Sequence, residues 1–133
     1  MTIYYKLKDW VPIDKLNWNI LSSNEYAIEL LENNLDKICW YSLSRNKSAI
    51  RLLEKNLDKI YWDYLCLNEN ALPILKKNLD KINWSRLSIN EGAVELLIKN
   101  KEKIDYEWLS WNCSPDIRDL IITNLDKISW DIL

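Results

Sequence analysis

Apolar side chains recur along the chain with a period of about 22 residues. In the period that begins at Trp40, Ala49, Leu52 and Leu53 lie at positions i, i+3 and i+4, which is the spacing of one apolar stripe on an α-helix. Trp40 and Leu43, three residues apart, place two large groups on one face of another helix. Each period therefore predicts a first helix of roughly five to seven residues and a second, longer helix of roughly nine or ten.

Polar residues mark the boundaries of these elements. Leu-Asp-Lys-Ile occurs at 35–38, 57–60, 79–82 and 125–128, with the relaxed copy Lys-Glu-Lys-Ile at 101–104. We expect this motif to form a tight turn or a single 3₁₀ turn. After one intervening residue, each copy is followed by an aromatic ring, the first residue of the next unit, at Trp40, Trp62, Trp84, Tyr106 and Trp130.

Side chains that can cap helices stand at matching places in the unit. Asn83, Asp105 and Ser129 precede the ring and are predicted to cap the first helix. Asn46 is predicted to cap the second helix, and Asn56 to end it in the left-handed conformation that Asn tolerates.

A unit of this size is too small to bury its apolar faces alone, so successive copies must stack on one another. We predict an all-α fold, an α-solenoid of about five 22-residue two-helix repeats, in which the aromatic rings and the apolar stripes form one continuous core. Residues 1–133 form a single domain, with an N-terminal capping half-unit at 1–17, five repeats at 18–129 and a truncated sixth repeat at 130–133.

Two places depart from the period. The fifth copy carries two extra residues, and we expect Asn112 and Cys113 to lengthen its inter-helix loop, with the second helix starting at Ser114 and Pro115. Pro73 falls inside the second helix expected for the third copy, where it should remove a backbone hydrogen bond or displace the start of the helix.

Composition narrows the chemistry. The chain has no His and a single Gly, which argues against His-based catalysis, the usual zinc sites and glycine-rich phosphate loops. The acidic residues follow the repeat, and no single acidic pair stands out as a glycosidase pair would, so we predict no enzyme, no metal and no cofactor. Three Cys residues at three different places in the repeat indicate free thiols.

Charges of both signs are interspersed, and the net charge is −2. No basic cluster suited to nucleic acid is present. The recurrent Asp and Lys form two ladders, interpreted as a solvated rim with turn hydrogen bonds; a basic rail for a phosphate chain is the alternative. No apolar run approaches the roughly 20 residues that span a bilayer, and no signal-peptide core is found, so we expect a soluble, cytoplasmic protein with no membrane partner.

Positions at which the copies differ are candidates for function. The second, third and sixth residues of the unit vary, and several are Tyr, Trp or Arg, which are enriched at interaction hot spots. The candidate partner-binding residues are Arg45, Tyr64, Arg86, Trp108 and Trp111. The alternative is that Trp108 and Trp111 merely pack within the lengthened fifth loop.

The last residues begin a unit that is not completed. We expect the apolar face at this end to remain exposed, and an exposed apolar patch usually marks a contact with another molecule. The candidate self-association residues are Trp130, Ile132 and Leu133.

The cadence Leu-Ser-x-Asn-x-x-Ala-Ile-x-Leu-Leu-x-x-Asn-x-Asp-Lys-Ile-x-Trp, over about residues 14–133, resembles the tandem repeats of giant DNA viruses that infect amoebae. In that family both Asn residues are often followed by Pro; here Leu and Glu or Lys take those places. The resemblance implies a viral protein in the host cytoplasm or in the particle, and it implies no activity. A weaker similarity is to leucine-rich-variant repeats, which alternate an α-helix with a 3₁₀ helix.

Two functions are compatible with these features. The first is a non-catalytic protein–protein interaction scaffold built from stacked helical repeats. The alternative is a structural component that self-assembles end to end in a viral particle or fibre. Concentration-dependent size would separate them.

Overall fold

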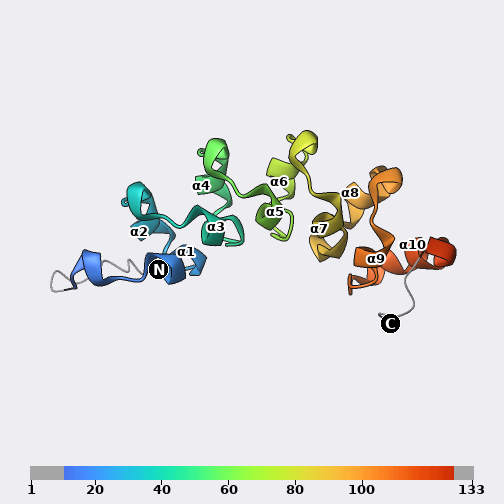
Figure 1. Ribbon diagram of the computed structural model, residues 1–133, viewed down its shortest axis with the longest axis horizontal. Helices are drawn as coiled ribbons and strands as arrows, with labels where there is room; N and C mark the ends of the chain where they lie inside the picture. Colours follow the sequence, from blue (N-terminus) through green and yellow to red (C-terminus); the bar gives the residue numbers. More distant parts are fainter. Residues whose placement is uncertain (1–10, 128–133) are drawn as a thin grey trace, which may run out of the picture.

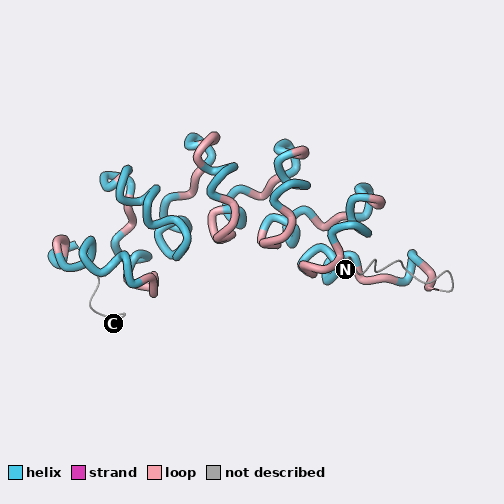
Figure 2. The backbone as a smooth tube through the Cα atoms, turned by 180° about the vertical axis from the view of Figure 1, so that it is seen from behind, coloured by secondary structure: helices cyan, strands magenta, loops and turns pink. Residues whose placement is uncertain are grey.

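The computed structural model describes residues 11–127, and within this range the regular structure is entirely helical. The elements follow one another in a repeating order of first helix, second helix and 3₁₀ turn, which confirms the predicted stack of helical repeats (Figure 1). The first helices form one row and the second helices from α2 to α8 another, and the whole bends into an arch with the first helices on its inner side (Figures 1 and 2).

The bounds of the helices follow the repeat. The first helices are α1 Trp18–Ser23, α3 Trp40–Ser44, α5 Trp62–Leu65, α7 Trp84–Ile89 and α9 Tyr106–Leu109. The second helices are α2 Ile28–Glu32, α4 Ile50–Glu54, α6 Leu72–Leu75, α8 Val94–Lys99 and α10 Arg118–Ile122.

Short 3₁₀ helices connect these elements. The predicted 3₁₀ turn of the Leu-Asp-Lys-Ile motif is confirmed at η2 Leu35–Lys37, η3 Leu57–Lys59, η4 Leu79–Lys81, η6 Lys101–Lys103 and η8 Leu125–Lys127. A related turn, η1 Ile13–Lys15, precedes α1, and η5 Glu91–Ala93 and η7 Pro115–Ile117 precede two of the second helices.

The prediction of a longer second helix is wrong, because the second helices have only four to six residues, as do the first helices. The residues predicted as the first turn of a long helix form a separate turn. In the second repeat this turn closes when the N–H of Ala49 donates to the carbonyl of Asn46 at 3.1 Å. The helix proper then begins at Ile50, with Ala49 as its N-cap.

The core is a continuous line of aliphatic side chains rather than a line of rings. Leu43, Leu65 and Leu87 from the first helices are fully buried, as are Leu53 and Leu75 from the second helices. The rings, predicted as core, are only half-buried and pack against the edge of this line: Trp18, Trp40, Trp62, Trp84 and Tyr106.

The exposed faces of three rings are covered by lysines near the end of the same repeat. The ammonium of Lys59 lies 5.1 Å from the ring centroid of Trp40, and that of Lys103 lies 4.9 Å from Trp84. Lys127 repeats the contact over Tyr106 at 5.2 Å. Since a cation above an aromatic ring is attracted by the ring's quadrupole, the Lys of the motif holds the end of its repeat against the ring that begins the same repeat.

Buried asparagines join the repeats through the backbone. The Nδ2 group of Asn68 donates to the carbonyls of Ser44 and Asn46 in the preceding repeat, at 3.1 and 3.0 Å. Its Oδ1 accepts from the N–H of Asn70 at 3.1 Å, so one side chain both fixes its own turn and binds the neighbouring unit. Asn46 and Asn112 each donate twice in the same way, and Asn90 donates to one preceding carbonyl.

These hydrogen bonds from the buried asparagines, here called the asparagine ladder, show that two predictions are wrong. Asn46 does not cap α4, because its Oδ1 accepts from the N–H of Ser48 in the preceding turn. Asn112 keeps the ladder position in the fifth repeat, so the two extra residues lie after it, between Asn112 and Ile117. Ser114 precedes η7, with Pro115 in the first turn as predicted, but its side chain makes no cap hydrogen bond.

Other helix ends can be compared with the predictions. The predicted caps Asn83 and Asp105 are confirmed, since they accept from the N–H groups of Arg86 and Trp108. Asn56 has φ −136 and is not left-handed; its Nδ2 instead donates to the carbonyl of Leu52.

Pro73 does not disturb its repeat. It lies in the first turn of α6, and this helix begins at Leu72, the position that matches Ile50 in the second repeat. Because the first N–H groups of a helix have no intrahelical partner, Pro is tolerated at this place.

Candidate functional site

The variable positions of the first helices pair across the interfaces between repeats. The second position of one repeat contacts the third position of the next. The Oγ of Ser42 donates to Oδ1 of Asn19. The rings of Tyr41 and Tyr64 have centroids 4.2 Å apart, and the guanidinium of Arg86 lies 4.0 Å from the carboxylate of Asp63. A residue that varies at the second position of one repeat is thus matched by a contacting residue at the third position of the next repeat.

Three tyrosines, here called the tyrosine cluster, lie together where the second and third repeats meet: Tyr41, Tyr61 and Tyr64. Tyr41 and Tyr61 have ring centroids 6.0 Å apart and an interplanar angle of 80°. These two rings remain 42% and 52% exposed. The neighbouring Tyr64, through its side-chain hydrogen bond and then its charge, raises the pKa of Tyr41 above its ordinary value.

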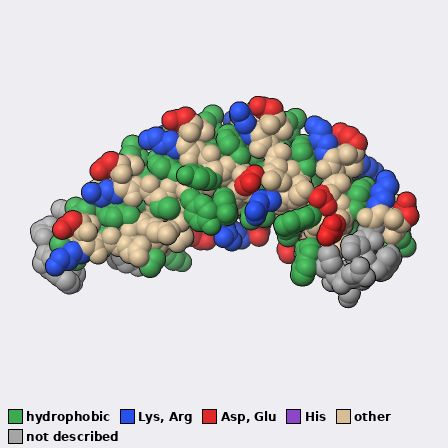
Figure 3. All heavy atoms as spheres, in the orientation of Figure 1, with side chains coloured by type: hydrophobic (Ala, Val, Ile, Leu, Met, Phe, Trp, Pro, Cys, Tyr) green, Lys and Arg blue, Asp and Glu red, His purple; other side chains and the backbone are tan. Residues whose placement is uncertain are grey.

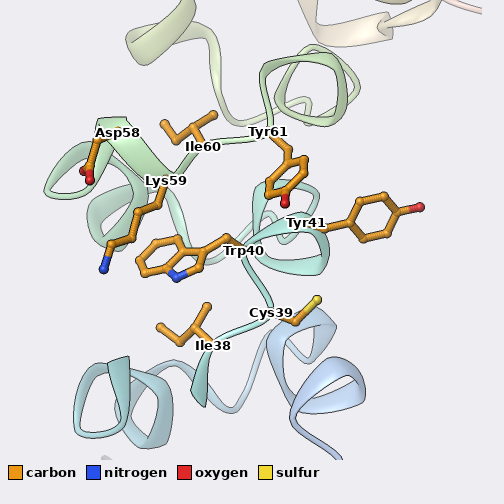
Figure 4. A pocket seen from close by; sticks show the side chains of 8 residues that line it. All are labelled: Ile38, Cys39, Trp40, Tyr41, Asp58, Lys59, Ile60 and Tyr61. Atoms are coloured by element: carbon orange, nitrogen blue, oxygen red, sulfur yellow. The ribbon is translucent and has the colours of Figure 1, made fainter. Parts of the chain in front are cut away.

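An open groove of about 560 Å³ lies beside the cluster. Its walls are the extended segments that precede α3 and α5, with Tyr41 and Tyr61 at one end and Asp58 and Lys59 at the other (Figure 4). Trp40 points toward Lys59, while Tyr41 points away from the ribbon on the opposite side (Figure 4).

The predicted partner-binding residues fall into three groups. Tyr64 and Arg86 are together, because the guanidinium of Arg86 lies 5.4 Å from the centroid of the Tyr64 ring. Arg45 is exposed at the end of α3 and makes no salt bridge with any residue between 11 and 127. Trp108 and Trp111, separate from the cluster in the fifth repeat, are 39% and 59% exposed.

The sequence prediction missed Tyr41 and Tyr61 as parts of the surface. Tyr41 occupies the variable second position, but Tyr61 stands just before the ring, a place assigned only to capping. A signal was available, since Tyr61 replaces the polar cap that Asn83 and Asp105 provide in other repeats. Trp130, Ile132 and Leu133, predicted to mediate self-association, lie outside the described residues.

The outer rim carries the charge ladders (Figure 3). Acidic and basic side chains gather there in alternation along the upper edge of the arch, where the 3₁₀ turns lie. Lys37 lies 3.9 Å from Asp36, and Lys81 lies 3.8 Å from Asp80. Carboxylates therefore interrupt the lysines along the rim, as the solvated-rim interpretation predicts.

The cysteines are free thiols, as predicted. Cys113 is exposed and Cys66 is buried. Burial raises the pKa of the Cys66 thiol to about 11, while the nearby backbone N–H of Asn83 acts in the opposite direction. Between residues 11 and 127, the structure contains no group of three or more acidic or Cys side chains arranged to hold a metal ion. In the same range no helix has the length and apolarity to cross a membrane.

Comparisons with protein-family models, with curated proteins and with solved structures found no match to this chain.

Proposed function

We propose that this protein is a non-catalytic interaction scaffold that presents the exposed surface of its first helices, here called the first-helix face, to a protein partner. The observation that carries the proposal is the tyrosine cluster, with two half-exposed rings, one in α3 and one at the N-cap of α5. Exposed aromatic side chains beside an Arg are the residue types that dominate binding at protein interfaces. Stacked repeats provide the extended inner surface on which such partners bind.

The first repeat argues against the alternative, a structural component assembled end to end in repeat register. The position two residues after the ladder Asn faces the preceding repeat. It is Gly92 in the fourth repeat, where an added Cβ would lie 2.9 Å from the carbonyl oxygen of Glu69. In the first repeat this position is Tyr26, which is 84% exposed. A ring of that size obstructs a second copy that would stack there as one repeat stacks on the next.

The proposal extends to the setting of the protein. The resemblance to repeats of giant DNA viruses supports a viral protein that acts in the host cytoplasm or in the particle. Extract of infected amoebae is therefore the appropriate source of partners.

A capture experiment tests the scaffold proposal. The immobilised chain is incubated with infected-cell extract, in parallel with a variant of the first-helix face, Tyr41→Ala with Tyr61→Ala and Trp111→Ala. A matched variant changes exposed apolar residues elsewhere, Tyr26→Ala with Ile98→Ala and Ile122→Ala. We expect mass spectrometry to find proteins that the wild type and the matched variant retain and the face variant loses. Equal capture by all three chains would contradict the proposal.

Sedimentation of the purified chain separates the two functions. A scaffold that acts through its first-helix face keeps one sedimentation coefficient as its concentration rises. A steady increase of size with concentration would favour the self-assembling component instead.

A further inference from the structure

We infer that the first-helix face binds an extended proline-rich peptide, in the polyproline II conformation, that carries an acidic side chain. This inference rests on the proposed scaffold function and names the class of partner. It is carried by the spacing of the repeats, by the geometry of the tyrosine cluster and by the charge of Arg45.

The spacing of the repeats matches the pitch of the proposed ligand. The first helices follow one another along the inner side of the arch (Figure 1). Packed helices in proteins lie about 8–10 Å apart, and we take this distance as the step from one first helix to the next. A polyproline II helix has three residues per turn and rises about 3.1 Å per residue, so every third residue advances about 9 Å. A β-strand repeats its side-chain direction after only about 6.6–6.8 Å. The side chains of a strand ligand would therefore fall out of register with the repeats.

The tyrosine cluster offers the contacts that such a ligand needs. Polyproline II has no internal hydrogen bonds, so its carbonyls remain free to accept from a protein donor. Tyrosine provides an apolar ring for a proline ring and a hydroxyl for a carbonyl. Tyr41 lies in α3 and Tyr61 is the N-cap of α5, and because their rings stand at 80° to each other they present a face and an edge beside two successive first helices. The adjoining groove of about 560 Å³ has room for a proline ring between the segments that lead into α3 and α5.

The charges beside the cluster select an acidic ligand. Arg86 is already engaged, since it lies against both Asp63 and the ring of Tyr64. Lys59 lies over the ring of Trp40. Arg45 is close enough to Tyr41 to influence its titration, yet it has no ion-pair partner among residues 11–127. The carboxylate of Asp58 lies at the far end of the groove, away from the tyrosines. At the tyrosine end the charge that has no ion-pair partner in the described part of the chain is that of Arg45, which favours a carboxylate in the ligand and disfavours a basic one.

Fluorescence anisotropy with labelled synthetic peptides tests the inference. The probe is a proline peptide of about four turns, with a glutamate in each turn. One comparison peptide has lysine in place of glutamate, and another keeps the glutamates but has glycine and serine in place of proline. We expect the proline–glutamate probe to bind at least tenfold more tightly than either comparison peptide.

Variants locate the binding. Tyr41→Ala and Tyr61→Ala are each expected to weaken binding of the probe about tenfold, whereas Tyr26→Ala, the matched change of an exposed tyrosine in the first repeat, leaves it unchanged. Arg45→Glu is expected to reverse the preference between the glutamate and lysine peptides, and Arg51→Glu, at an exposed arginine on the second helix α4, is not. Circular dichroism confirms that each variant retains the helical signal of the wild type.

The results separate this inference from the scaffold proposal. If the folded wild type binds no probe, or binds the glycine–serine peptide equally well, the proline-rich partner is wrong even where the face variant still loses captured proteins. The same holds if the tyrosine variants bind the probe as the wild type does. If the face variant captures the same proteins as the wild type, the scaffold proposal itself fails.

Discussion

At the scale of single residues, Asn68 links three backbone segments inside the stack. Its side chain is 1% exposed and makes two hydrogen bonds to the second repeat and one to its own turn. In Asn68→Ala, the carbonyl of Ser44 and the N–H of Asn70 lose their partner, while the carbonyl of Asn46 keeps the N–H of Ala49. Each unsatisfied group costs about 1–3 kcal/mol. We expect the free energy of unfolding to fall by about 2–4 kcal/mol, as measured by urea denaturation.

The control for this prediction is Asn33→Ala. Asn33 is exposed and donates one hydrogen bond to the carbonyl of Glu29 within its own repeat. Its loss should change stability by no more than about 0.5–1 kcal/mol, because water replaces the missing partner. Equal losses in the two variants would show that the buried ladder does not hold the repeats together.

Cys66 takes the place of a bridging serine. In the second and fourth repeats, the Oγ of Ser44 and Ser88 donates to the carbonyl of the ring residue and accepts from the N–H of the last residue of the same repeat, Tyr61 or Asp105. Cys66→Ser restores this hydroxyl beside ready partners. We expect it to leave the free energy of unfolding within about 1 kcal/mol of the wild type at pH 7.

The same substitution gives a pH prediction. The pKa of the Cys66 thiol is about 11 in the fold and 9.0 ordinarily, so between these values the unfolded chain loses the thiol proton while the folded chain keeps it. The unfolded state then binds fewer protons, and stability falls as the pH rises. From pH 9 to 11 we expect the wild type to lose on the order of 2 kcal/mol more than Cys66→Ser, followed by urea denaturation at each pH. Parallel curves for the two proteins would contradict a buried, protonated thiol.

Sequence spacing located most of these residues but not their partners. The recurrence of Asn46, Asn68 and Asn90 showed that the position matters, and capping was the local explanation available. The role in the ladder depends on carbonyls 22 to 24 residues earlier, which become neighbours only when the repeats stack. Likewise, Tyr64 and Arg86, which contact each other, were chosen from their residue types. Tyr61 joins the surface through its ring contact with Tyr41, which stands at the opposite end of the same repeat in sequence.

At the scale of the element, the apolar stripe predicted which residues are helical and buried, but not where the helix begins. Ala49 and Leu53 are buried as expected. The stripe extends into the preceding turn because Ala49 closes that turn and also packs on the core, so periodicity cannot distinguish it from a helical residue. The turn is distinguished from the helix by the hydrogen bond that the side chain of Asn46 accepts, and hydrophobic periodicity does not report such a bond.

Pro73 shows what the first turn of a second helix accepts, and the second repeat offers a place to test it. Arg51 is exposed at the position that matches Pro73. Because an N–H in the first turn of a helix has no intrahelical partner, Arg51→Pro should leave stability within about 1 kcal/mol of the wild type. Thermal denaturation followed by circular dichroism provides the measurement.

The contrasting substitution is Lys76→Pro. Lys76 is exposed, but its N–H donates to the carbonyl of Leu72 at 2.9 Å at the end of α6. Proline there removes the bond and collides with the preceding turn, at a cost of about 3 kcal/mol. Lys76→Ala separates this effect from the loss of the salt bridge to Glu95. If both proline variants lose the same stability, the position in the helix is not what decides tolerance.

At the scale of the whole molecule, the period of 22 residues was sufficient to predict a stack, whereas the bend of the stack was not predictable. The arch depends on small rotations between units, and the repeat pattern alone does not reveal them. The direction of that bend decides which helices line the inner side of the arch, and therefore where a partner would lie. Sequence patterns therefore gave the architecture and only part of the surface.

A stack in which each repeat contacts only its neighbours distributes stability unevenly along the chain. The free energy of unfolding is then approximately the sum of the intrinsic stabilities of the repeats and the interaction free energies of the interfaces between them. Loss of an interface in the middle separates the stack into two short pieces, while loss of one near an end releases a single repeat. Asn68 and Asn112 occupy the same ladder position at a central and an outer interface, and each donates twice to the preceding repeat.

Native-state hydrogen exchange on Asn68→Ala and Asn112→Ala measures this difference. In Asn112→Ala we expect faster exchange from α9 to α10, with α3 and α5 protected as in the wild type, because the first four repeats keep their interfaces. In Asn68→Ala, protection should fall on both sides of the break, since neither piece alone buries enough apolar surface to remain folded. If the central substitution accelerated exchange only in its own repeat, the repeats would be independently stable, and the buried ladder would not couple them.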